Sequence, residues 1–150
     1  MDVIVAGPEH AEEVARLFDG YRMFYRQPSD PDGCRAFIAE RLANGDSHIL
    51  CAVHDGRLVG FTQLYPSFTS VGMQRIWVLN DLFVDPDARR LGVGRTLLRA
   101  ACEHGRATGA VRLTLETEVS NTRAQALYED EGWEKGEGFY VYTIGLESAG

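Results

Sequence analysis

The segment that most constrains the fold spans residues 74–116, where a strand, a helix and a second strand are expected in succession. The first strand, over 74–84, ends at a turn that contains proline. Apolar residues then recur at helical spacing over 92–107, and Gly109 ends that helix. Apolar and polar residues alternate over 111–116, as in a strand with one buried face. Such a chain is expected to build a sheet covered by helices.

The remaining segments predict an α/β fold of the α+β type. The strongest local signal is a hairpin whose strands, 47–54 and 58–65, flank Asp55-Gly56, a dipeptide that tolerates the positive φ angles of a tight turn. A break over 27–33 separates the first two helices. The other expected elements are strands over 2–6 and 139–146, and helices from Pro8 to about Tyr25, from about Phe37 to Asn44, and from Ser120 or Asn121 to Glu131. We expect one domain over residues 1–150, with a mixed central sheet of six to seven strands, antiparallel in its N-terminal part and flanked by about four helices.

Net charge and apolar runs exclude two classes of function. The 150 residues carry 15 basic and 22 acidic side chains, a net charge of −7, which is the wrong sign for covering nucleic-acid phosphates over a broad surface. The longest apolar run, Ile49–Val53, is far shorter than the roughly 20 residues of a membrane-spanning helix. The first ten residues show no secretory leader pattern. We therefore expect a cytoplasmic protein that binds neither nucleic acid nor membranes.

The cysteines and histidines do not predict a metal site. Cys34, Cys51 and Cys102 form no Cys-x-x-Cys pair and are interpreted as small buried apolar residues. The four histidines show no spacing that places two on one helix face with a third ligand nearby. We expect no metal cofactor.

A turn rich in arginine and glycine precedes the helix over 92–107. A strand that ends just before a helix leaves backbone N–H groups at the positive end of the helix dipole, where they bind anions. Gly92 and Gly94 allow the backbone to approach a phosphate closely. Three arginines add positive charge at the rim: Arg89, Arg90 and Arg95. Residues 75–99 hold five arginines and three aspartates, a net charge of +2, so the rest of the chain carries −9.

Two motifs resemble those of a known family. The run Arg89-Arg90-Leu91-Gly92-Val93-Gly94 resembles the Gln/Arg-x-x-Gly-x-Gly/Ala signature of the GNAT superfamily of N-acetyltransferases. Downstream, the fixed positions of a second segment, Asn-x-x-Ala-x-x-x-Tyr-x-x-x-Gly-Phe/Trp, are filled by Asn121, Ala124, Tyr128, Gly132 and Trp133. The resemblance spans nearly the whole chain and implies the GNAT fold and an N-acetyltransferase that uses acetyl-CoA as co-substrate.

The resemblance also implies where acetyl-CoA binds. Its pyrophosphate would lie on the backbone of 90–95, and its pantetheine arm would lie along the end of the strand at 82–84. The second motif would line the other side of that groove. The residues concerned are Leu82, Phe83, Val84, Arg89, Arg90, Leu91, Gly92, Val93, Gly94, Arg95, Asn121 and Ala124.

The expected chemistry is attack of an amine on a thioester. Backbone N–H groups near Phe83 and Val84 can donate to the oxyanion that forms. Tyr128 is the candidate acid, because a phenol with a pKa of about 10 can protonate a leaving thiolate whose conjugate thiol has a pKa of about 8.5; a core tyrosine is the alternative. An alkylamine with a pKa near 10.4 is mostly protonated at pH 7, so a base or a water must remove its proton. Asp81 and Glu116 are the candidate bases, and a structural role stays open for each.

One segment suggests the acceptor. Trp77–Val84 most resembles the motif strand of the spermidine/spermine and thialysine acetyltransferase branch, Leu-Glu-Asp-aromatic-aromatic-Val, with Asp81 retained and Asn80 in place of the glutamate. Tyr21 and Tyr25 lie on one side of the first helix, where that branch builds its acceptor pocket, although such stripes also form cores. With the acidic remainder of the chain, these features favour a small cationic amine as acceptor, and the family implies a homodimer.

Two alternatives stay open. The first is acetylation of a protein or peptide amino group, which needs an open groove between the loops over 27–33 and 66–72. The second is a non-catalytic module that binds acyl-CoA without turnover. An intact Tyr128 argues against the second alternative.

Overall fold

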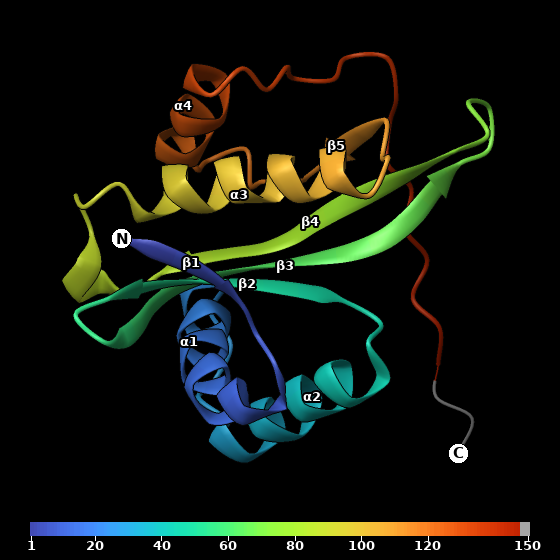
Figure 1. Cartoon of the computed structure of the whole chain (residues 1–150). Coiled ribbons are helices and arrows are strands. Elements are labelled where there is room, and N and C mark those ends of the chain that lie inside the picture. Colours follow the sequence, from blue (N-terminus) through green and yellow to red (C-terminus); the bar gives the residue numbers. More distant parts are fainter. Residues whose placement is uncertain (148–150) are drawn as a thin grey trace. The chain divides into compact units, whose positions relative to one another are not determined.

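The computed structural model describes residues 1–147, and these divide into two compact units, Met1–Glu116 and the part from Thr117 onward. The first unit contains a mixed sheet whose five strands lie in chain order (Figure 1). These strands are β1 (Asp2–Val5), β2 (His48–His54), β3 (Arg57–Thr69), β4 (Gln74–Val84) and β5 (Arg112–Thr114). β1 to β4 pair antiparallel, as predicted for the N-terminal part, and β5 joins β4 in parallel.

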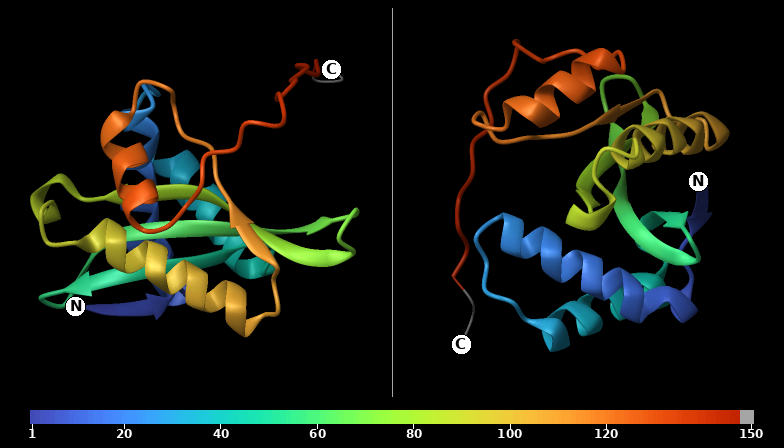
Figure 2. Two further views of the ribbon diagram at one scale, coloured as in Figure 1. Left: turned by 90° about the horizontal axis from the view of Figure 1, so that it is seen from above. Right: turned by 90° about the vertical axis from the view of Figure 1, so that its left-hand side faces the viewer.

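Three helices of the first unit cover the two faces of this sheet. α1 (Ala11–Phe24) and α2 (Pro31–Asn44) pack together on one face, and α3 (Val93–Ala107) lies on the other (Figure 2). Short 3₁₀ helices, η1 (Pro8–His10) and η2 (Pro86–Ala88), precede α1 and α3. The second unit contains α4 (Thr122–Asp130). For the described residues, the predicted α+β class with about four helices is confirmed. None of the described helices combines the length and the apolar character of a membrane-spanning segment.

Apolar side chains are buried on both faces of the sheet. Leu17, Ile38 and Phe61 belong to one buried cluster on the side of α1 and α2. Leu97 and Leu98 of α3 are also buried. The apolar stripe predicted for the helix over 92–107 therefore packs inward, as an amphipathic helix requires.

The hairpin between β2 and β3 forms at the predicted dipeptide. Asp55 and Gly56 have φ angles of 51° and 76°. Two successive left-handed residues make the tight turn whose twist matches that of the flanking strands. The local sequence therefore determines this pairing.

Helix α2 begins at Pro31, inside the segment predicted as a break over 27–33. Asp30 caps the helix, because its carboxylate accepts a hydrogen bond from an N–H of the first turn at 3.0 Å. The buried Asp19 carboxylate of α1 accepts two more, from the Asp30 N–H at 2.8 Å and from Ser29 Oγ at 2.7 Å. These bonds hold the pKa of Asp19 below its usual value and tie the start of α2 to α1.

The predicted strand over 139–146 is wrong, and the sheet has five strands instead of six to seven. Large apolar side chains of this segment, such as Phe139, Tyr142 and Leu146, are exposed. Their β propensity is high, but a strand forms only where a neighbouring strand completes its hydrogen bonds. The described part of the second unit holds no strand, so this segment has no partner within its unit.

Two histidines stack between β2 and α3. The rings of His48 and His104 are nearly parallel, with centroids 3.6 Å apart, and the Trp77 ring centroid lies 4.6 Å from that of His104. Nε2 of His104 is buried and has no hydrogen-bond partner among the described residues. Burial, together with repulsion from His104, lowers the pKa of His48 to about 4, and burial also lowers the pKa of His104.

We expect this histidine pair to make the fold sensitive to acid. The unfolded chain protonates His48 near pH 6.5, whereas the folded chain does so only near pH 4, so stability is present above pH 6.5 and is lost as the pH falls toward 4. The expected loss of unfolding free energy between pH 7 and pH 5 is about 1 kcal/mol, after allowance for the partial exposure of His48. Urea unfolding, followed by Trp77 fluorescence in a Trp133→Phe background, measures this loss.

Two variants separate the stacked pair from other histidines. His48→Phe keeps an aromatic ring against His104 but removes a titrating group, so the acid-dependent loss should shrink. His54→Phe, at the end of β2, should leave the loss as in the wild type. An undiminished loss in His48→Phe would contradict the assignment.

Candidate active site

A β-bulge interrupts the pairing of β3 with β4. Gln63 pairs with Asp81, and the next residue, Leu64, pairs with Leu79, so Asn80 is the extra residue on β4. Bulges redirect side chains and are common beside active sites. Asn80 and Asp81, both predicted as site residues, therefore lie at an irregularity of the sheet.

Asp81 is a buried carboxylate surrounded by neutral hydrogen-bond donors. The residue is only 2% exposed. Its Oδ1 accepts a hydrogen bond from Asn80 Nδ2 at 2.8 Å, and its Oδ2 accepts one from Gln63 Nε2 at 2.5 Å. Burial raises the pKa of Asp81, and hydrogen bonds from Asn80, Gln63 and Tyr21 oppose part of this rise. A carboxyl group with a raised pKa is a better proton acceptor from an ammonium group.

Tyrosines from α1 and β3 interact with Asp81. The Tyr21 hydroxyl donates to the Asn80 carbonyl oxygen at 3.1 Å. Burial and the nearby Asp81 charge raise the pKa of Tyr21 and raise that of Tyr65 to about 12, so both phenols are neutral at pH 7. Tyr25 packs on Tyr21 with ring centroids 5.1 Å apart. Tyr21 and Tyr25, predicted as acceptor residues, thus form one aromatic group beside the bulge.

β4 has an unpaired edge beyond the end of β5. The parallel ladder joins only Ile76–Val78 to Arg112–Thr114. Among the described residues of the first unit, no strand pairs with 79–84 on that side, which leaves backbone N–H groups available to a ligand. The predicted pantetheine residues on this edge are Leu82, Phe83 and Val84.

The turn between η2 and α3 has the backbone geometry of an anion site. Arg90 and Gly92 have left-handed φ angles of 69° and 75°, and α3 begins at Val93. The bond from the Thr96 N–H to the Gly92 oxygen is 3.0 Å long, and the N–H groups before Thr96 have no acceptor inside the helix. No side chain caps this end and no acidic residue lies in its first turn, within the described structure. These features fit a pyrophosphate group.

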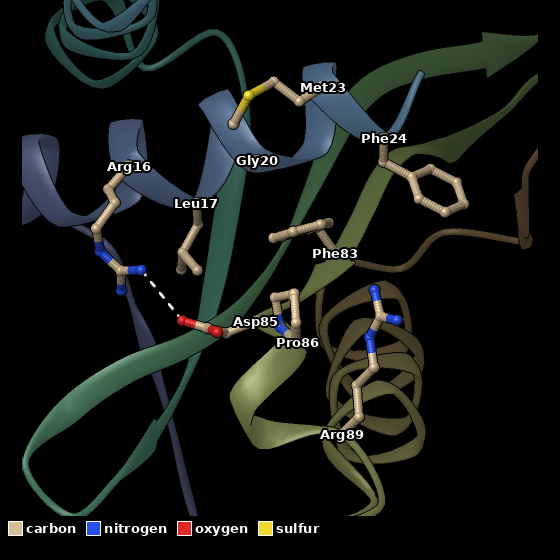
Figure 3. A pocket seen from close by; sticks show the side chains of 9 residues that line it. All are labelled: Arg16, Leu17, Gly20, Met23, Phe24, Phe83, Asp85, Pro86 and Arg89. Atoms are coloured by element: carbon tan, nitrogen blue, oxygen red, sulfur yellow. Dashed lines mark hydrogen bonds and ion pairs between the residues drawn. The ribbon is translucent and has the colours of Figure 1, made fainter. Parts of the chain in front are cut away.

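A pocket of about 430 Å³ lies between α1 and the end of β4 (Figure 3). At one side of it, Arg16 donates to Asp85 Oδ2 at 3.1 Å. A Cβ on Gly20 would lie 2.9 Å from Cζ of Phe83, so glycine at this position lets α1 approach β4 closely. Figure 3 shows the Arg89 side chain extending toward Phe24. The lining residues are Arg16, Leu17, Gly20, Met23, Phe24, Phe83, Asp85, Pro86 and Arg89.

The second unit holds the second motif, which begins at the N-cap of α4 and ends just beyond that helix. Asn121 caps this helix, since its Oδ1 accepts a hydrogen bond from the Ala124 N–H at 3.2 Å. Tyr128 lies further along the helix, with its ring centroid 6.2 Å from that of Trp133. The predicted short helix is confirmed, and the roles of its residues stay predictions.

The structure gathers some predicted residues and separates others. Asn80 and Asp81 meet Tyr21 at the bulge. Glu116 is exposed and lies two residues beyond the end of β5. Val93 is buried, so its backbone is the part that can serve an anion site. Arg89, Arg90 and Leu91 are exposed at the turn.

Sequence reasoning missed three polar residues connected with Asp81: Ser47, Gln63 and Tyr65. Gln63 is fully buried and lies on the same strand face as Phe61, two residues away. A glutamine at an inward position of an apolar strand is unusual, and this was the available signal. Its position opposite Asp81 depends on the bulge, which the sequence of one strand does not reveal.

A family comparison covers both motifs. The model of the acetyltransferase (GNAT) family matches residues 12–133, which is more than half of the chain. The chain belongs to this family. The GNAT protein is an enzyme, an N-acetyltransferase, as the family and its similar relatives show.

Relatives and a solved structure agree with this assignment. The N-acetyltransferase is 48% identical to an uncharacterised N-acetyltransferase, YhfO, of Bacillus subtilis (strain 168), over 97% of this chain and 98% of the relative. It is 24% identical to a thialysine N-epsilon-acetyltransferase of Caenorhabditis elegans, over 95% and 91% of the two chains. The crystal structure of a probable acetyltransferase has a TM-score of 0.92, 41% identity and 99% coverage of each chain.

Proposed function

We propose that this enzyme moves the acetyl group of acetyl-CoA to a primary amine of a small cationic molecule, by direct attack in a ternary complex. The observation that carries the proposal is the Asp81 carboxylate, which is buried at the bulge. None of the described residues supplies a cationic partner to it. A buried carboxylate held only by neutral donors favours the approach of one positive charge.

Acetyl-CoA supplies an activated acetyl thioester, and the chain supplies its binding site. We propose that the N–H groups at the start of α3, with the left-handed residues Arg90 and Gly92, hold the pyrophosphate. Those backbone N–H groups of 82–84 that point away from β3 would hold the pantetheine arm and donate to the acetyl oxygen. The second motif supports Asn121 and Ala124 as further contacts.

Asp81 is the proposed general base. An alkylammonium with a pKa near 10.4 is a weak acid toward an ordinary carboxylate, and the raised pKa of Asp81 narrows this difference. The same carboxylate would orient the amine through a charge-assisted hydrogen bond. Glu116 is exposed beyond β5 and is therefore the second candidate.

Tyr128 is the proposed general acid. A phenol within hydrogen-bond reach of the sulfur can deliver a proton to the leaving thiolate. Its place at the fixed tyrosine position of the second motif supports this role. The proton would come from the Tyr128 hydroxyl oxygen.

The residues around Asp81 support a cationic acceptor. Tyr21, Tyr25 and Tyr65 can surround an ammonium group with ring faces and hydroxyl oxygens. Asn80 is exposed at the bulge and can accept a hydrogen bond from the acceptor. A distant relative is named for thialysine, which agrees with the resemblance of the motif strand to that branch.

We also propose that the chain acts as one acetyltransferase domain. The family match runs over 12–133 and so includes parts of both compact units. The family resemblance supports a homodimer, and the sequence supports a cytoplasmic location. Light scattering after gel filtration tests the dimer.

Release of free CoA in the presence of candidate amines tests the proposed reaction. The panel contains diamines, amino acids, aminoglycosides and peptides, each at the same concentration. We expect small cationic amines to accelerate thiol release most. Faster release with peptides would instead assign a protein or peptide acceptor. Tight acetyl-CoA binding with no acceleration by any amine would contradict the proposed transfer.

A further inference from the structure

Two successive side-chain hydrogen bonds connect Ser47, through Gln63, to the Asp81 carboxylate. Ser47 Oγ donates to Gln63 Oε1 at 2.8 Å, and Gln63 Nε2 donates to Asp81 Oδ2 at 2.5 Å. Ser47 directly precedes β2, Gln63 lies on β3 and Asp81 lies on β4. The chain of hydrogen bonds therefore runs across neighbouring strands, and Gln63, at its centre, has no solvent exposure.

The orientation of the Gln63 amide follows from its two partners. An ionised carboxylate can only accept hydrogen bonds, so the amide must turn its Nε2 toward Asp81. Its Oε1 then faces Ser47, whose hydroxyl donates to it. Rotation of the amide would place two acceptor oxygens against each other and leave buried polar atoms unpaired, which is costly.

Gln63 differs from the other amide that holds Asp81. Asn80 also donates to the carboxylate, but Asn80 is exposed at the bulge and is within reach of an incoming acceptor. Gln63 lies on the buried side and keeps its bond whatever the acceptor does. A buried donor of this kind fixes Oδ2 of the carboxylate, while Oδ1, held by the exposed Asn80 side chain, keeps a second lone pair for a substrate proton.

We propose that Gln63 is a positioning residue that holds the Asp81 carboxylate in its working orientation, with Ser47 locking the Gln63 amide. This inference rests on the proposed role of Asp81. The described titratable groups that interact with Asp81 are Tyr21 on α1 and Tyr65 on β3. Both are neutral near pH 7, so no charged neighbour replaces the Gln63 hydrogen bond when it is lost.

The test is a pH titration of the Asp81 carboxyl carbon in the apo enzyme. Aspartate labelled with carbon-13 at the carboxyl group gives the signal, and its absence in Asp81→Asn assigns it. Gln63→Met removes the donor at similar volume, and we expect the titration midpoint to rise by about one to two pH units, the size of one charge-assisted hydrogen bond. Ser47→Ala should shift it in the same direction by less, and Ser47→Thr, which keeps a hydroxyl, should restore the wild-type midpoint.

Thr62→Val is the matched control. Thr62 is also fully buried and donates to Asp81 at 2.8 Å, but to the backbone oxygen. This variant should lose stability without shifting the carboxyl midpoint. If Gln63→Met does not fold, Gln63→Glu replaces it. The two adjacent carboxyl groups should then titrate in two coupled steps, and the upper midpoint should lie above the Asp81 midpoint of the wild type.

Kinetics separate this inference from the proposed function. With an accepted amine, the acid limb of kcat/KM should move up with the titration midpoint in Gln63→Met, while the KM for acetyl-CoA stays within about twofold. An unshifted midpoint in a folded Gln63 variant would overturn the positioning role. A shifted midpoint in an enzyme that acetylates no amine would support the Gln63 bond and reject the proposed transfer.

Discussion

Gly94→Glu is expected to abolish binding of acetyl-CoA. The substitution places bulk and a negative charge in the first turn of α3, where the proposed pyrophosphate site relies on backbone N–H groups and the positive end of the helix dipole. We expect affinity to fall about 100-fold or more, which corresponds to about 2.7 kcal/mol. Isothermal titration calorimetry with acetyl-CoA measures the change.

The control for this experiment is the same substitution at an exposed glycine. Gly136→Glu adds an equal charge at a position where a side chain meets nothing within 4 Å. Its affinity should remain that of the wild type. Thermal unfolding of both variants reports whether the fold is intact. Wild-type affinity in a folded Gly94→Glu variant would remove the pyrophosphate assignment.

Tyr128→Phe is expected to slow turnover with little change in acetyl-CoA binding. The substitution keeps the ring beside Trp133 and removes the proton that we assign to the leaving thiolate. Loss of a general acid lowers kcat by about 100-fold to 10,000-fold. Initial rates at saturating acetyl-CoA and amine measure kcat, and calorimetry with acetyl-CoA measures the affinity.

An exposed tyrosine provides the comparison for Tyr128. Tyr140 is 91% exposed in the segment after α4, and Tyr140→Phe should turn over like the wild type. A thiol with a lower pKa leaves with less need of an acid, so a better leaving group on the acetyl donor should reduce the effect of Tyr128→Phe. Unchanged kcat in Tyr128→Phe would make this residue a packing tyrosine.

The elements that the sequence predicts well are those with local causes. The strand over 74–84 coincides with β4. A proline-containing turn ends it, and several of its apolar side chains are buried in the core. The hairpin turn at Asp55-Gly56 has the φ angles that the dipeptide predicts. Helix α2 starts earlier than predicted because Asp30 and Asp19 supply hydrogen bonds that a composition-based break does not reveal.

The parts that the sequence predicts poorly depend on partners distant in the chain. The apolar segment over 139–146 has strand composition, yet its described unit offers no strand to pair with. The motif predicts Asp81 as a candidate base, but the burial of Asp81 and its hydrogen bond with Gln63 depend on a register shift between β3 and β4. A register shift is a property of how two strands pair, so it cannot be read from the sequence of β3 or of β4 alone.

The bulge at Asn80 means that the sheet could accommodate the deletion of this one residue. The pairs on either side of Asn80, Gln63 with Asp81 and Leu64 with Leu79, are already consecutive on β3. Loss of the single codon for Asn80 would therefore close the ladder into a regular one and leave every other strand pair in step. The protein lacking Asn80 would keep both motifs and the sheet. It would lose the bulge beside Asp81, on which the proposed acceptor chemistry depends. We therefore expect deletion of Asn80 to leave a folded protein that acetylates amines poorly.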